Sequence, residues 1–600
     1  MRAVVSIFGR IRTIAETYIR EHLRTLLKIR HRLVIREEFL HLALAVVVGV
    51  LGGVCNLFFH LSEELLKILI FGHNAEISEI ARGLLWWQKI ITPTAGGLAA
   101  GLILLIGMKV SAKEAPSNIL EAVIVGQGRL SFRSGLVKTF SSLISLTSGA
   151  SIGREGSIVH LSATIASKFG QLLDYHPYKL RLLTACGAAA GISAAFNAPL
   201  TGAVFAAQIV IGNFSMTMFT PIILSSVVAA MMSRSFFGIE PLYHVPVFEF
   251  TRLSQLPWIG LVGVGSGLIG AGFLKGIDLV ERQMKTTIKR FYFRIMIGGL
   301  LVGAISVFYP WVWGNGYGPA NMILDGKFTV NVLLGLVLAK AIATMISVGS
   351  GMVAGIMTPS LFIGAAYGSF CGLGLHALNL GENLPVCVFA LAGMASVFAA
   401  TTHSPLMAML LVFEISLNYS LMPALMLACP LATLVARRFH RDSVYTKPLR
   451  ERGIEVRESK KFGIAEINVV ADIMRKPVTP LYNTTPFEQI IERFLSSPNN
   501  FLPVVDSDYR LIGVVSLQDV KEFLSRNENI LGIIAYDVMR PVPYYLTPQQ
   551  TLQDAFPVLI NSEMRNIPVV DTTENMKLIG SVLRSEALGI LSEKIAATPR

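Results

Sequence analysis

Charged side chains are scarce in the middle of this 600-residue chain. They make up 15% of all residues, against 52% for apolar ones, and they crowd into roughly the first 38 and the last 160 positions. The charge-poor centre has no cluster of His, Asp and Glu, no nucleophile elbow and no phosphate-binding loop. We therefore expect the chain not to be an enzyme.

Cysteine is also rare. The five cysteines stand singly in apolar surroundings, at Cys55, Cys186, Cys371, Cys387 and Cys429. Their spacing fits neither a metal-binding motif nor a disulfide framework, so they are interpreted as small buried apolar residues and no metal site is predicted.

Long apolar runs occupy the charge-poor centre. The following approach or reach the length of about 20 residues that crosses a bilayer: Phe39–Phe59, Ile90–Met108, Met216–Met232, Leu256–Leu274 and Val332–Val348. Other runs are shorter, glycine-rich and interrupted, and irregular backbone is tolerated in a bilayer only where protein or water satisfies it. We expect an α-helical polytopic membrane protein with about ten to a dozen or more helical passes, some of them incomplete.

The basic residues predict how the chain lies in the membrane. Residues 1–38 carry nine Lys or Arg against four Glu, threaded through apolar residues, which is typical of an amphipathic helix on the cytoplasmic side. A second basic cluster, Arg437–Arg441, ends the last apolar run. Both termini are therefore expected in the cytoplasm, with an even number of crossings of the cell membrane. The net charge of +13 does not predict nucleic acid as a partner, because the basic clusters flank membrane segments and no nucleic-acid motif accompanies them.

One membrane segment carries two ionisable residues and is repeated. Residues 147–157 place Arg154 and Glu155 among small residues between apolar stretches, and an ionisable residue at membrane depth marks an ion pathway by default. The segment recurs later in the chain, where Ser350, Gly351 and Gly355 correspond to Ser148, Gly149 and Gly153. The repeat continues downstream, with Gly393, Ala400, Pro405, Leu406 and Ile415 corresponding to Gly187, Ala194, Pro199, Leu200 and Ile209. Two such copies predict a transport site built from broken helices. The alternative, a pair of small-residue packing motifs, does not explain the adjacent Arg and Glu.

The tail contains a second duplication. Residues 472–475 (Asp-Ile-Met-Arg) recur at 537–540 as Asp-Val-Met-Arg, and 502–506 (Leu-Pro-Val-Val-Asp) recur at 567–571 as Ile-Pro-Val-Val-Asp. Each copy runs through an amphipathic helix, a strand, a polar turn, a second strand and a closing helix, which is an α/β pattern. The tail closely resembles a tandem pair of CBS domains, with the first at 466–528, the second at 531–592 and a short end at 593–600.

Paired CBS domains commonly hold an adenine nucleotide such as ATP, ADP or AMP. By this resemblance, Ser516 and Asp519 of the first copy would bind the ribose, while Leu583 replaces the hydroxyl in the second copy. At most one site is therefore expected. The alternative is that Ser516 caps a helix with Asp519 in its first turn, which needs no ligand.

The motifs of the membrane part together resemble the CLC chloride channels and proton/chloride exchangers. They are Gly153-Arg154-Glu155-Gly156, the stretch 187–202, the element Gly355-Ile356-Met357-Thr358-Pro359 and a late tyrosine, Tyr445. The resemblance implies a transmembrane domain at 39–445 with inverted halves at about 40–236 and 255–440, followed by a linker at 446–465. It also implies a homodimer in which each subunit has its own path, with chloride or a similar small anion as substrate and no required cofactor.

The chemistry of such a path explains the residue types. Half-helix starts offer backbone N–H groups and a positive dipole end to an anion without carrying a full charge. By resemblance, Gly153, Gly355 and the amides near Ile356 and Met357 surround the anion, and the Tyr445 hydroxyl donates to it from the cytoplasmic side. Glu155 would be the gate, since its carboxylate mimics the anion when ionised, which would make gating depend on pH and chloride. By the same resemblance Arg154 belongs to the residues around the anion. Its own role is interpreted as structural, and the alternative is a salt bridge between Arg154 and Glu155.

Two departures from the family affect the prediction. Proton-coupled members often have an acid at the position of Ile209, so a voltage-gated channel is favoured and an antiporter is the alternative. His160 and Glu414 lie in apolar surroundings and could substitute for this acid, but each is interpreted as a hydrogen-bonded structural residue. The second departure is at 111–118, where Lys113 or Glu114 stands at the position of an anion-binding serine, which leaves the preferred anion open. These two side chains could instead pair with each other.

A CBS-regulated cation transporter is the remaining alternative. It would need intramembrane carboxylates to bind the metal. The charge-poor centre supplies too few of them, and its glycine-rich helix starts suit anions.

Overall fold

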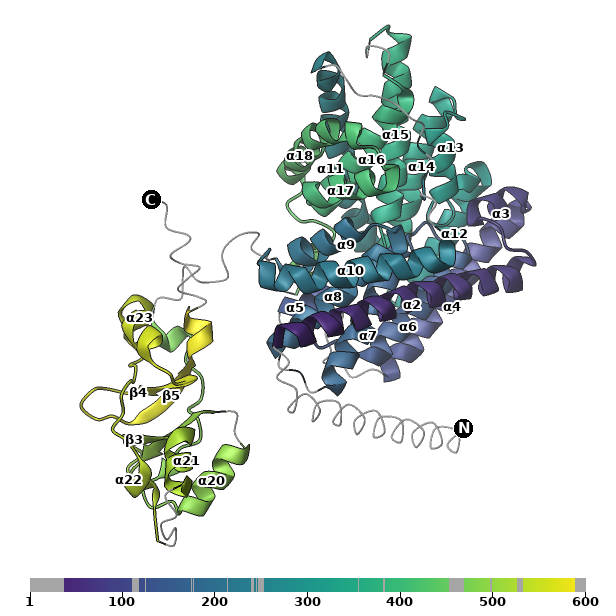
Figure 1. Ribbon diagram of the computed structural model, residues 1–600. Helices are drawn as coiled ribbons and strands as arrows, with labels where there is room; N and C mark the ends of the chain where they lie inside the picture. Colours follow the sequence, from purple (N-terminus) through teal and green to yellow (C-terminus); the bar gives the residue numbers. More distant parts are fainter. Residues whose placement is uncertain are drawn as a thin grey trace, which may run out of the picture. The chain divides into compact units, whose positions relative to one another are not determined.

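The computed structural model describes residues 37–110, 118–124, 126–173, 175, 177–212, 214–238, 242–243, 245, 253–353, 355–380, 384–452, 469–496, 499–525 and 532–588. The chain separates into two compact units that divide after Val456, each drawn in Figure 1.

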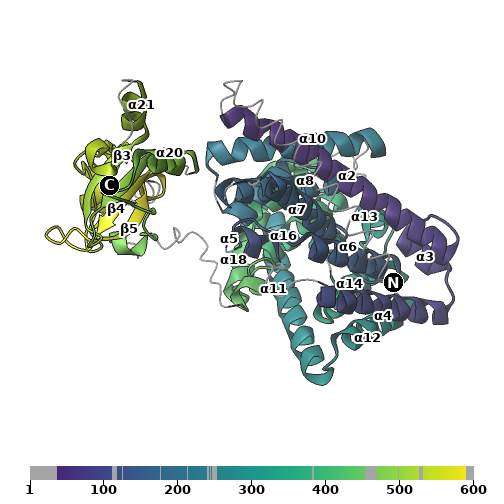
Figure 2. The same cartoon turned by 90° about the horizontal axis from the view of Figure 1, so that it is seen from below.

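The first half of the membrane unit runs from α2 to α10. Its helices are α2 (Glu37–Phe71), α3 (Ile77–Gly83), α4 (Trp86–Val110), α5 (Ile119–Ile124), α6 (Phe132–Thr147), α7 (Glu155–Leu172), α8 (Pro177–Phe196), α9 (Pro199–Phe205), the π-helical turn η1 (Ala206–Ile211) and α10 (Met216–Phe237). Figures 1 and 2 both show α2 lying alongside α10.

The second half runs from α11 to α18. Its helices are α11 (Leu256–Thr287) after the short η2 (Leu253–Gln255), α12 (Phe291–Phe308), η3 (Pro310–Val312), α13 (Tyr317–Leu324), α14 (Val330–Gly349), α15 (Met357–Ala377), α16 (Val386–Thr402), α17 (Pro405–Ser416), η4 (Tyr419–Leu421) and α18 (Met422–Phe439). The predicted polytopic helical fold with broken helices is thereby confirmed.

Eight helices of the described residues are long and apolar enough to cross a membrane: α2, α4, α10, α11, α12, α14, α15 and, with η4, α18. Shorter apolar helices lie at Pro199–Ile211, Val386–Thr402 and Pro405–Ser416. Helix α2 continues past the apolar run that predicted it, through a charged turn. There Lys67 lies 3.6 Å from Glu63 and His60 lies 3.5 Å from Glu64, each pair at helical spacing, so the charges are partnered within the helix.

The duplicated sequence produces duplicated turns. Asn197 and His403 take left-handed backbone angles (φ 56° and 55°) after α8 and α16, and a proline then begins α9 and α17. Gly149 and Gly351 likewise take positive φ values of 104° and 96° after α6 and α14. A side chain at Gly149 would also meet Trp313, since a Cβ there would lie 2.5 Å from the indole ring.

The membrane unit extends beyond its predicted end. The stretch from 446, which was expected to begin a linker, forms α19 (Lys447–Arg450), and Leu449 in that helix is buried against the unit's apolar core. The reason is an ion cluster, described below, that fastens Lys447 to α11.

The second unit has the duplicated α/β arrangement predicted for it. In the first copy β1 (Leu481–Tyr482) pairs in parallel with β2 (Phe501–Val505), and β2 pairs antiparallel with β3 (Leu511–Ser516). In the second copy β4 (Asn566–Val570) pairs antiparallel with β5 (Leu578–Leu583), with the same break in register before the last valine. Its helices are η5 (Val470–Asp472), α20 (Phe487–Ser496), α21 (Leu517–Ser525), α22 (Ala535–Val538) and α23 (Leu552–Asn561).

Candidate functional site

Two helix starts meet inside the membrane unit. Gly153 precedes α7 and Gly355 precedes α15, and they form an isolated antiparallel bridge. The Gly153 N–H donates to the Gly355 carbonyl at 2.7 Å, and the Gly355 N–H donates to the Gly153 carbonyl at 3.1 Å. These glycines hold equivalent positions in the sequence repeat, so the bridge joins the two halves at matching points.

The carboxylate of Glu155 lies at the start of the opposite helix. Glu155 is the first residue of α7 and is fully buried. Its Oε1 accepts the backbone N–H of Thr358 at 3.0 Å, and its Oε2 accepts the Thr358 hydroxyl at 2.9 Å. Thr358 is in the first turn of α15, where amides have no partner within the helix and the helix dipole favours negative charge.

Both bridging glycines are needed for space. A Cβ at Gly153 would lie 2.1 Å from a Glu155 carboxylate oxygen, and a Cβ at Gly355 would lie 2.7 Å from the same oxygen. Either methyl group would displace the carboxylate or the backbone.

Arg154 turns away from its neighbour Glu155. Its guanidinium lies 5.3 Å from the ring centre of Tyr317, and its Nη1 lies 3.2 Å from His60 Nδ1 and 3.7 Å from Glu63 Oε2 on α2. Through these contacts Arg154 links α7 with α13 and α2.

Tyr317 connects these two groups of contacts. Its hydroxyl lies 3.3 Å from the Thr358 hydroxyl, which donates to Glu155, and its ring lies beneath Arg154. Thr358, Tyr317, His60 and Glu63 were not predicted as site residues. Thr358 lies within the Gly355–Pro359 element, and Tyr317 lies between two glycines, so each had a weak signal in the sequence.

Ile356 and Met357 lie at the same helix start. Ile356 is the N-cap of α15, Met357 is its first residue, and both are buried. The Ile356 carbonyl accepts the Ser360 hydroxyl at 2.7 Å. The structure thus brings together Gly153, Glu155, Gly355, Ile356 and Met357, whereas Lys113 and Glu114 lie outside the described residues.

Tyr445 packs on the end of α9. Its ring centre lies 5.6 Å from that of Phe205, and it belongs to the partly buried residues around the apolar core. The neighbouring Val444 N–H donates to the Thr401 carbonyl at 3.2 Å, which ties this segment to the end of α16.

The three polar residues near the expected proton path all have partners. Gln208 Oε1 accepts the Ser404 hydroxyl at 2.7 Å. Glu414 accepts the N–H groups of Leu200 and Thr201, each at 2.8 Å. His160 lies 3.1 Å from the Thr164 hydroxyl and 3.4 Å from Lys138 Nζ. These contacts agree with the structural interpretation of Glu414 and His160.

An ion cluster fastens the end of the membrane unit to α11. Lys447 Nζ lies 2.6 Å from Asp278 and 2.5 Å from Glu281, and His440 Nε2 lies 3.0 Å from Asp278. His440 Nδ1 also lies 2.7 Å from the Asp442 carbonyl. The hydrogen bond with Asp278 raises the pKa of His440 above its ordinary value, against the opposing effect of burial.

In the second unit, Ser516 and Asp519 form a helix cap. The Ser516 hydroxyl donates to Asp519 Oδ2 at 2.7 Å, and the Asp519 N–H donates back to the Ser516 hydroxyl at 3.0 Å. Arg540 from the other copy forms an ion pair with Asp519, and Arg475 pairs in the same way with Glu586 at 2.6 Å. Each copy thus sends the arginine of its repeated motif to the acid of the other copy.

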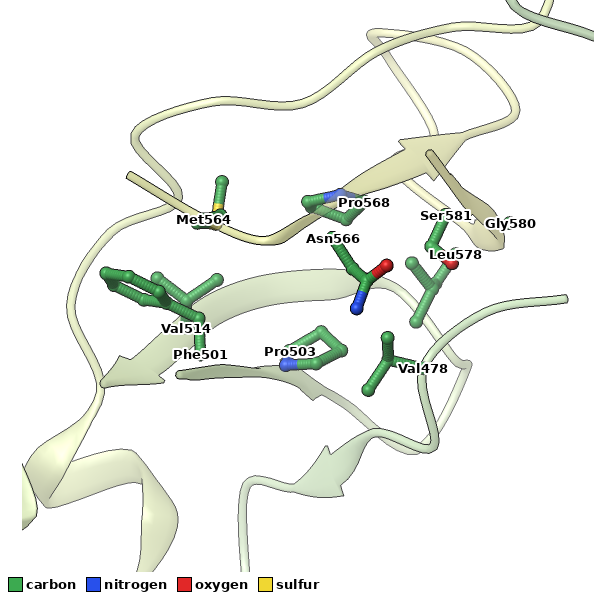
Figure 3. A pocket seen from close by; sticks show the side chains of 10 residues that line it. All are labelled: Val478, Phe501, Pro503, Val514, Met564, Asn566, Pro568, Leu578, Gly580 and Ser581. Carbon is green, nitrogen blue, oxygen red and sulfur yellow. The ribbon is translucent and has the colours of Figure 1, made fainter. Parts of the chain in front are cut away.

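A small pocket, partly open to solvent, lies between the two hairpins of this unit. Figure 3 shows the amide of Asn566 pointing into the space between the hairpins. The pocket is lined by Val478, Phe501, Pro503, Val514, Met564, Asn566, Pro568, Leu578, Gly580 and Ser581. Ser516 and Asp519 are not among these residues.

The membrane site has the chemistry of an anion site. It offers a backbone amide, a hydroxyl and a helix start that carry no full charge, and a carboxylate now accepts from them. Hydrogen bonds to a charged group contribute roughly 1.5–3 kcal/mol each, so a halide of the same charge could compete with this carboxylate. Among the described residues, no three His, Cys, Asp or Glu side chains gather as a metal ion would require.

Comparison with known families agrees with this chemistry. Residues 96–437 match the family described as voltage gated chloride channel, and residues 470–526 and 535–593 match the CBS domain. A ClcB-like chloride channel protein of Ralstonia nicotianae is 40% identical over 413 residues, which are 68% of this chain and 96% of that protein. The voltage-gated ClC-type chloride channel ClcB of Escherichia coli O17:K52:H18 is 36% identical over 68% of this chain and 98% of its own length.

Solved structures share the fold. A slow cyanobacterial Cl−/H+ antiporter matches 69% of this chain and 97% of its own with a TM-score of 0.60 and 22% identity. A eukaryotic CLC transporter matches 91% of this chain and 98% of its own with a TM-score of 0.61 and 20% identity.

Proposed function

Because this chain belongs to the voltage-gated chloride channel family, the CLC family, and ends in two CBS domains, we propose that it is a chloride channel whose path is closed by the Glu155 carboxylate. Chloride transport of the CLC type and a multi-pass membrane location follow from the family and from the eight apolar spans. The observation that carries the proposed gate is the pair of hydrogen bonds from Thr358 to Glu155, because the carboxylate accepts from donors that an anion would use.

Opening requires that the carboxylate leave these donors. A proton on Glu155 turns the carboxylate into a weaker acceptor, and a chloride ion can then take the Thr358 amide and hydroxyl. A high chloride concentration favours the same exchange by mass action. Flux is therefore expected to rise as the external pH falls and as chloride rises.

A channel is favoured over an antiporter by the residues near η1. Proton coupling needs a second titratable group on the way to Glu155, and the apolar Ile209 stands where proton-coupled relatives often have an acid. Gln208 beside it is engaged with Ser404. Proton/chloride antiport is the second candidate, supported by the description of a structure of the same fold as a Cl−/H+ antiporter.

Flux from reconstituted liposomes with opposed chloride and proton gradients tests both candidates. Fast chloride efflux without proton movement supports the channel, whereas uphill proton movement driven by chloride supports the antiporter. Glu155→Gln should remove the response to external pH while leaving a folded protein. Glu414→Gln, which changes a partly buried acid that accepts from the start of α9, is the matched control and should keep that response.

We further propose that Tyr445 donates its hydroxyl to the anion from the cytoplasmic side. We also propose that both termini lie in the cytoplasm and that the protein is a homodimer in the cell membrane.

Each subunit of this dimer is proposed to have its own path. The bridge between Gly153 and Gly355 supports this last point, because it assembles both helix starts from one chain.

The CBS pair is proposed to bind one adenine nucleotide and to regulate flux through it. Ser516 and Asp519 would need to release their mutual cap to hold a ribose. Flux of the full chain with ATP, ADP or AMP added on the CBS side tests this regulation, and an unchanged flux with all three would contradict it.

A further inference from the structure

A polar stripe runs along α14, a helix long and apolar enough to span the membrane. Lys340, Thr344 and Ser347 follow one another at helical spacing, and all three are completely buried. A fully buried lysine in a membrane helix costs several kcal/mol in lost hydration unless its contacts offset that loss. The contacts of these three side chains therefore show which parts of the fold they stabilise.

Lys340 fastens the loop that leads into α13. Its ammonium donates to the carbonyl oxygens of Val312 at 2.9 Å and Gly314 at 2.8 Å, and it lies 5.4 Å from the ring centre of Phe362. Tyr317 follows this loop as the first residue of α13.

Thr344 and Ser347 fasten the loop that leads into α7. The Thr344 hydroxyl lies 2.9 Å from the Ser151 hydroxyl, and the Ser347 hydroxyl accepts the Ser151 N–H at 3.2 Å. The two loops are also joined to each other, because the Gly314 N–H donates to the Ala150 carbonyl at 3.1 Å. Glu155 begins its helix only a few residues beyond Ser151.

The stripe therefore places a basic side chain next to the loops that carry Glu155 and Tyr317. Two carbonyl groups accept hydrogen bonds from the Lys340 ammonium and so favour its protonated form, and Glu76 and Glu155 are the acids that favour this charge. In a buried environment of low polarity such an interaction extends well beyond contact distance. The other titratable groups that interact with Glu155 or lie around it are Arg154, Tyr243, Tyr317, Tyr445, Glu63 and His60.

We propose that Lys340 is a positioning residue for the gate: its charge favours the ionised, closed form of Glu155, and its two hydrogen bonds hold the loop before Tyr317, which is bonded in turn to the loop before Glu155. This inference rests on the proposed role of Glu155. Loss of the charge should let Glu155 take up a proton in a less acidic medium, and the gate should open at higher pH.

The test is chloride flux from liposomes containing the full chain, measured against external pH. Lys340→Met should move the pH of half-maximal flux upward by about one unit, a tenfold change in proton concentration, because a buried charge in surroundings of low polarity has an effect of about this order. Lys340→Gln also removes the charge but keeps a donor for the loop carbonyls, and it should show the same shift. Lys340→Arg keeps the charge and should stay near the parent value.

Control variants separate this role from a general loss of structure. Thr344→Val removes a neighbouring hydrogen bond without changing charge and should shift the midpoint by much less than Lys340→Gln. If Lys340→Met does not fold, Lys340→Gln decides the matter alone. A folded Lys340→Gln protein with the parent midpoint overturns the inference. If instead Glu155→Gln keeps the parent's pH response, the proposed gate itself has failed.

Discussion

Gln208 and Glu414 hold the same position in the two halves of the membrane unit, and each binds the start of a helix that belongs to the other half. Gln208, in η1, accepts the hydroxyl of Ser404, the N-cap of α17. Glu414, in α17, accepts two N–H groups and the Thr201 hydroxyl at the start of α9. Helices α9 and α17 are neighbours in the fold (Figure 1), so this exchange fastens the halves together at a second place.

The exchange predicts unequal losses of stability. Glu414→Ala removes a carboxylate that accepts three hydrogen bonds and leaves the Leu200 and Thr201 amides without this partner, so it should lower the free energy of unfolding by about 2–4 kcal/mol. Gln208→Ala removes one neutral bond and should cost about 1 kcal/mol. Thermal or denaturant unfolding in detergent measures both. Equal losses of unfolding free energy in the two variants would mean that the charged acceptor at Glu414 stabilises the fold no more than the neutral one at Gln208.

Gly355→Ala should open the gate partly. The added Cβ would lie 2.7 Å from Glu155 Oε1 and 2.8 Å from the Gly156 nitrogen, so the carboxylate would be pushed from the Thr358 amide. Chloride flux at neutral pH should rise and its pH response should flatten. Gly374→Ala in the same helix is the matched control, because a Cβ there meets nothing within 4 Å. Parent-like flux in both variants would contradict the close packing described around Glu155.

His440 should make the stability of the membrane unit depend on pH. Both ring nitrogens face acceptors, Asp278 and the Asp442 carbonyl, so only the protonated ring donates to both. Because the folded pKa of His440 is raised above 6.5, its contribution is complete below that value and is lost as the pH rises through the folded pKa. Asp278 is 33% exposed, and screening by solvent keeps the effect below about 1 kcal/mol. The unfolding temperature should fall less between pH 6 and pH 8 in His440→Gln than in the parent. An equal fall would show that His440 is not the source of this pH dependence.

The CBS pair should bind no more than one adenine nucleotide per chain. Asp519→Asn removes the acid of the intact Ser-Asp pair and should abolish binding, whereas Glu586→Gln, at the matching place in the copy that has Leu583, should leave it unchanged. Calorimetry on the full chain in detergent counts the sites. Two sites, or equal effects of the two substitutions, would refute the assignment.

Two covalently linked subunits, with Glu155→Gln in only one, should show a mixture of one pH-dependent and one pH-independent flux component. Each chain supplies both bridged helix starts, so neither path needs the other subunit. Fluxes at several external pH values, fitted to one or two components, make the comparison. One blended response would mean a shared path.

The sequence indicated the helical membrane fold, the duplicated halves and the CBS pair because repeats and long apolar runs are local patterns. It also indicated Gly153, Glu155 and Gly355, since small residues next to a charge are unusual in a membrane segment. Thr358, Tyr317 and Lys340 could not be assigned in this way. Their roles depend on contacts between segments far apart in the chain, such as Lys340 with the carbonyls of the η3 loop, and one side chain in an apolar run does not reveal its partner.

The same limit applies to Ser516 and Asp519. Their spacing fits both a ribose site and a helix cap, and only the arrangement in space showed that they now bind each other and that Arg540 reaches Asp519 from the other copy. Helix α19 was missed because its four residues have no periodic pattern; the ion cluster with α11 holds it in place.

The bridge between Gly153 and Gly355 also has a consequence for biogenesis. While the ribosome has produced only the first half, the Gly153 amide has no carbonyl partner at Gly355. Glu155 likewise lacks the hydrogen bonds that Thr358 donates to it. An inserted first half therefore holds an acidic residue without these two hydrogen bonds until α15 arrives. Chains truncated before α15 should consequently remain recognisable to membrane proteases. The proposed anion path also cannot form until the start of α15 has been translated.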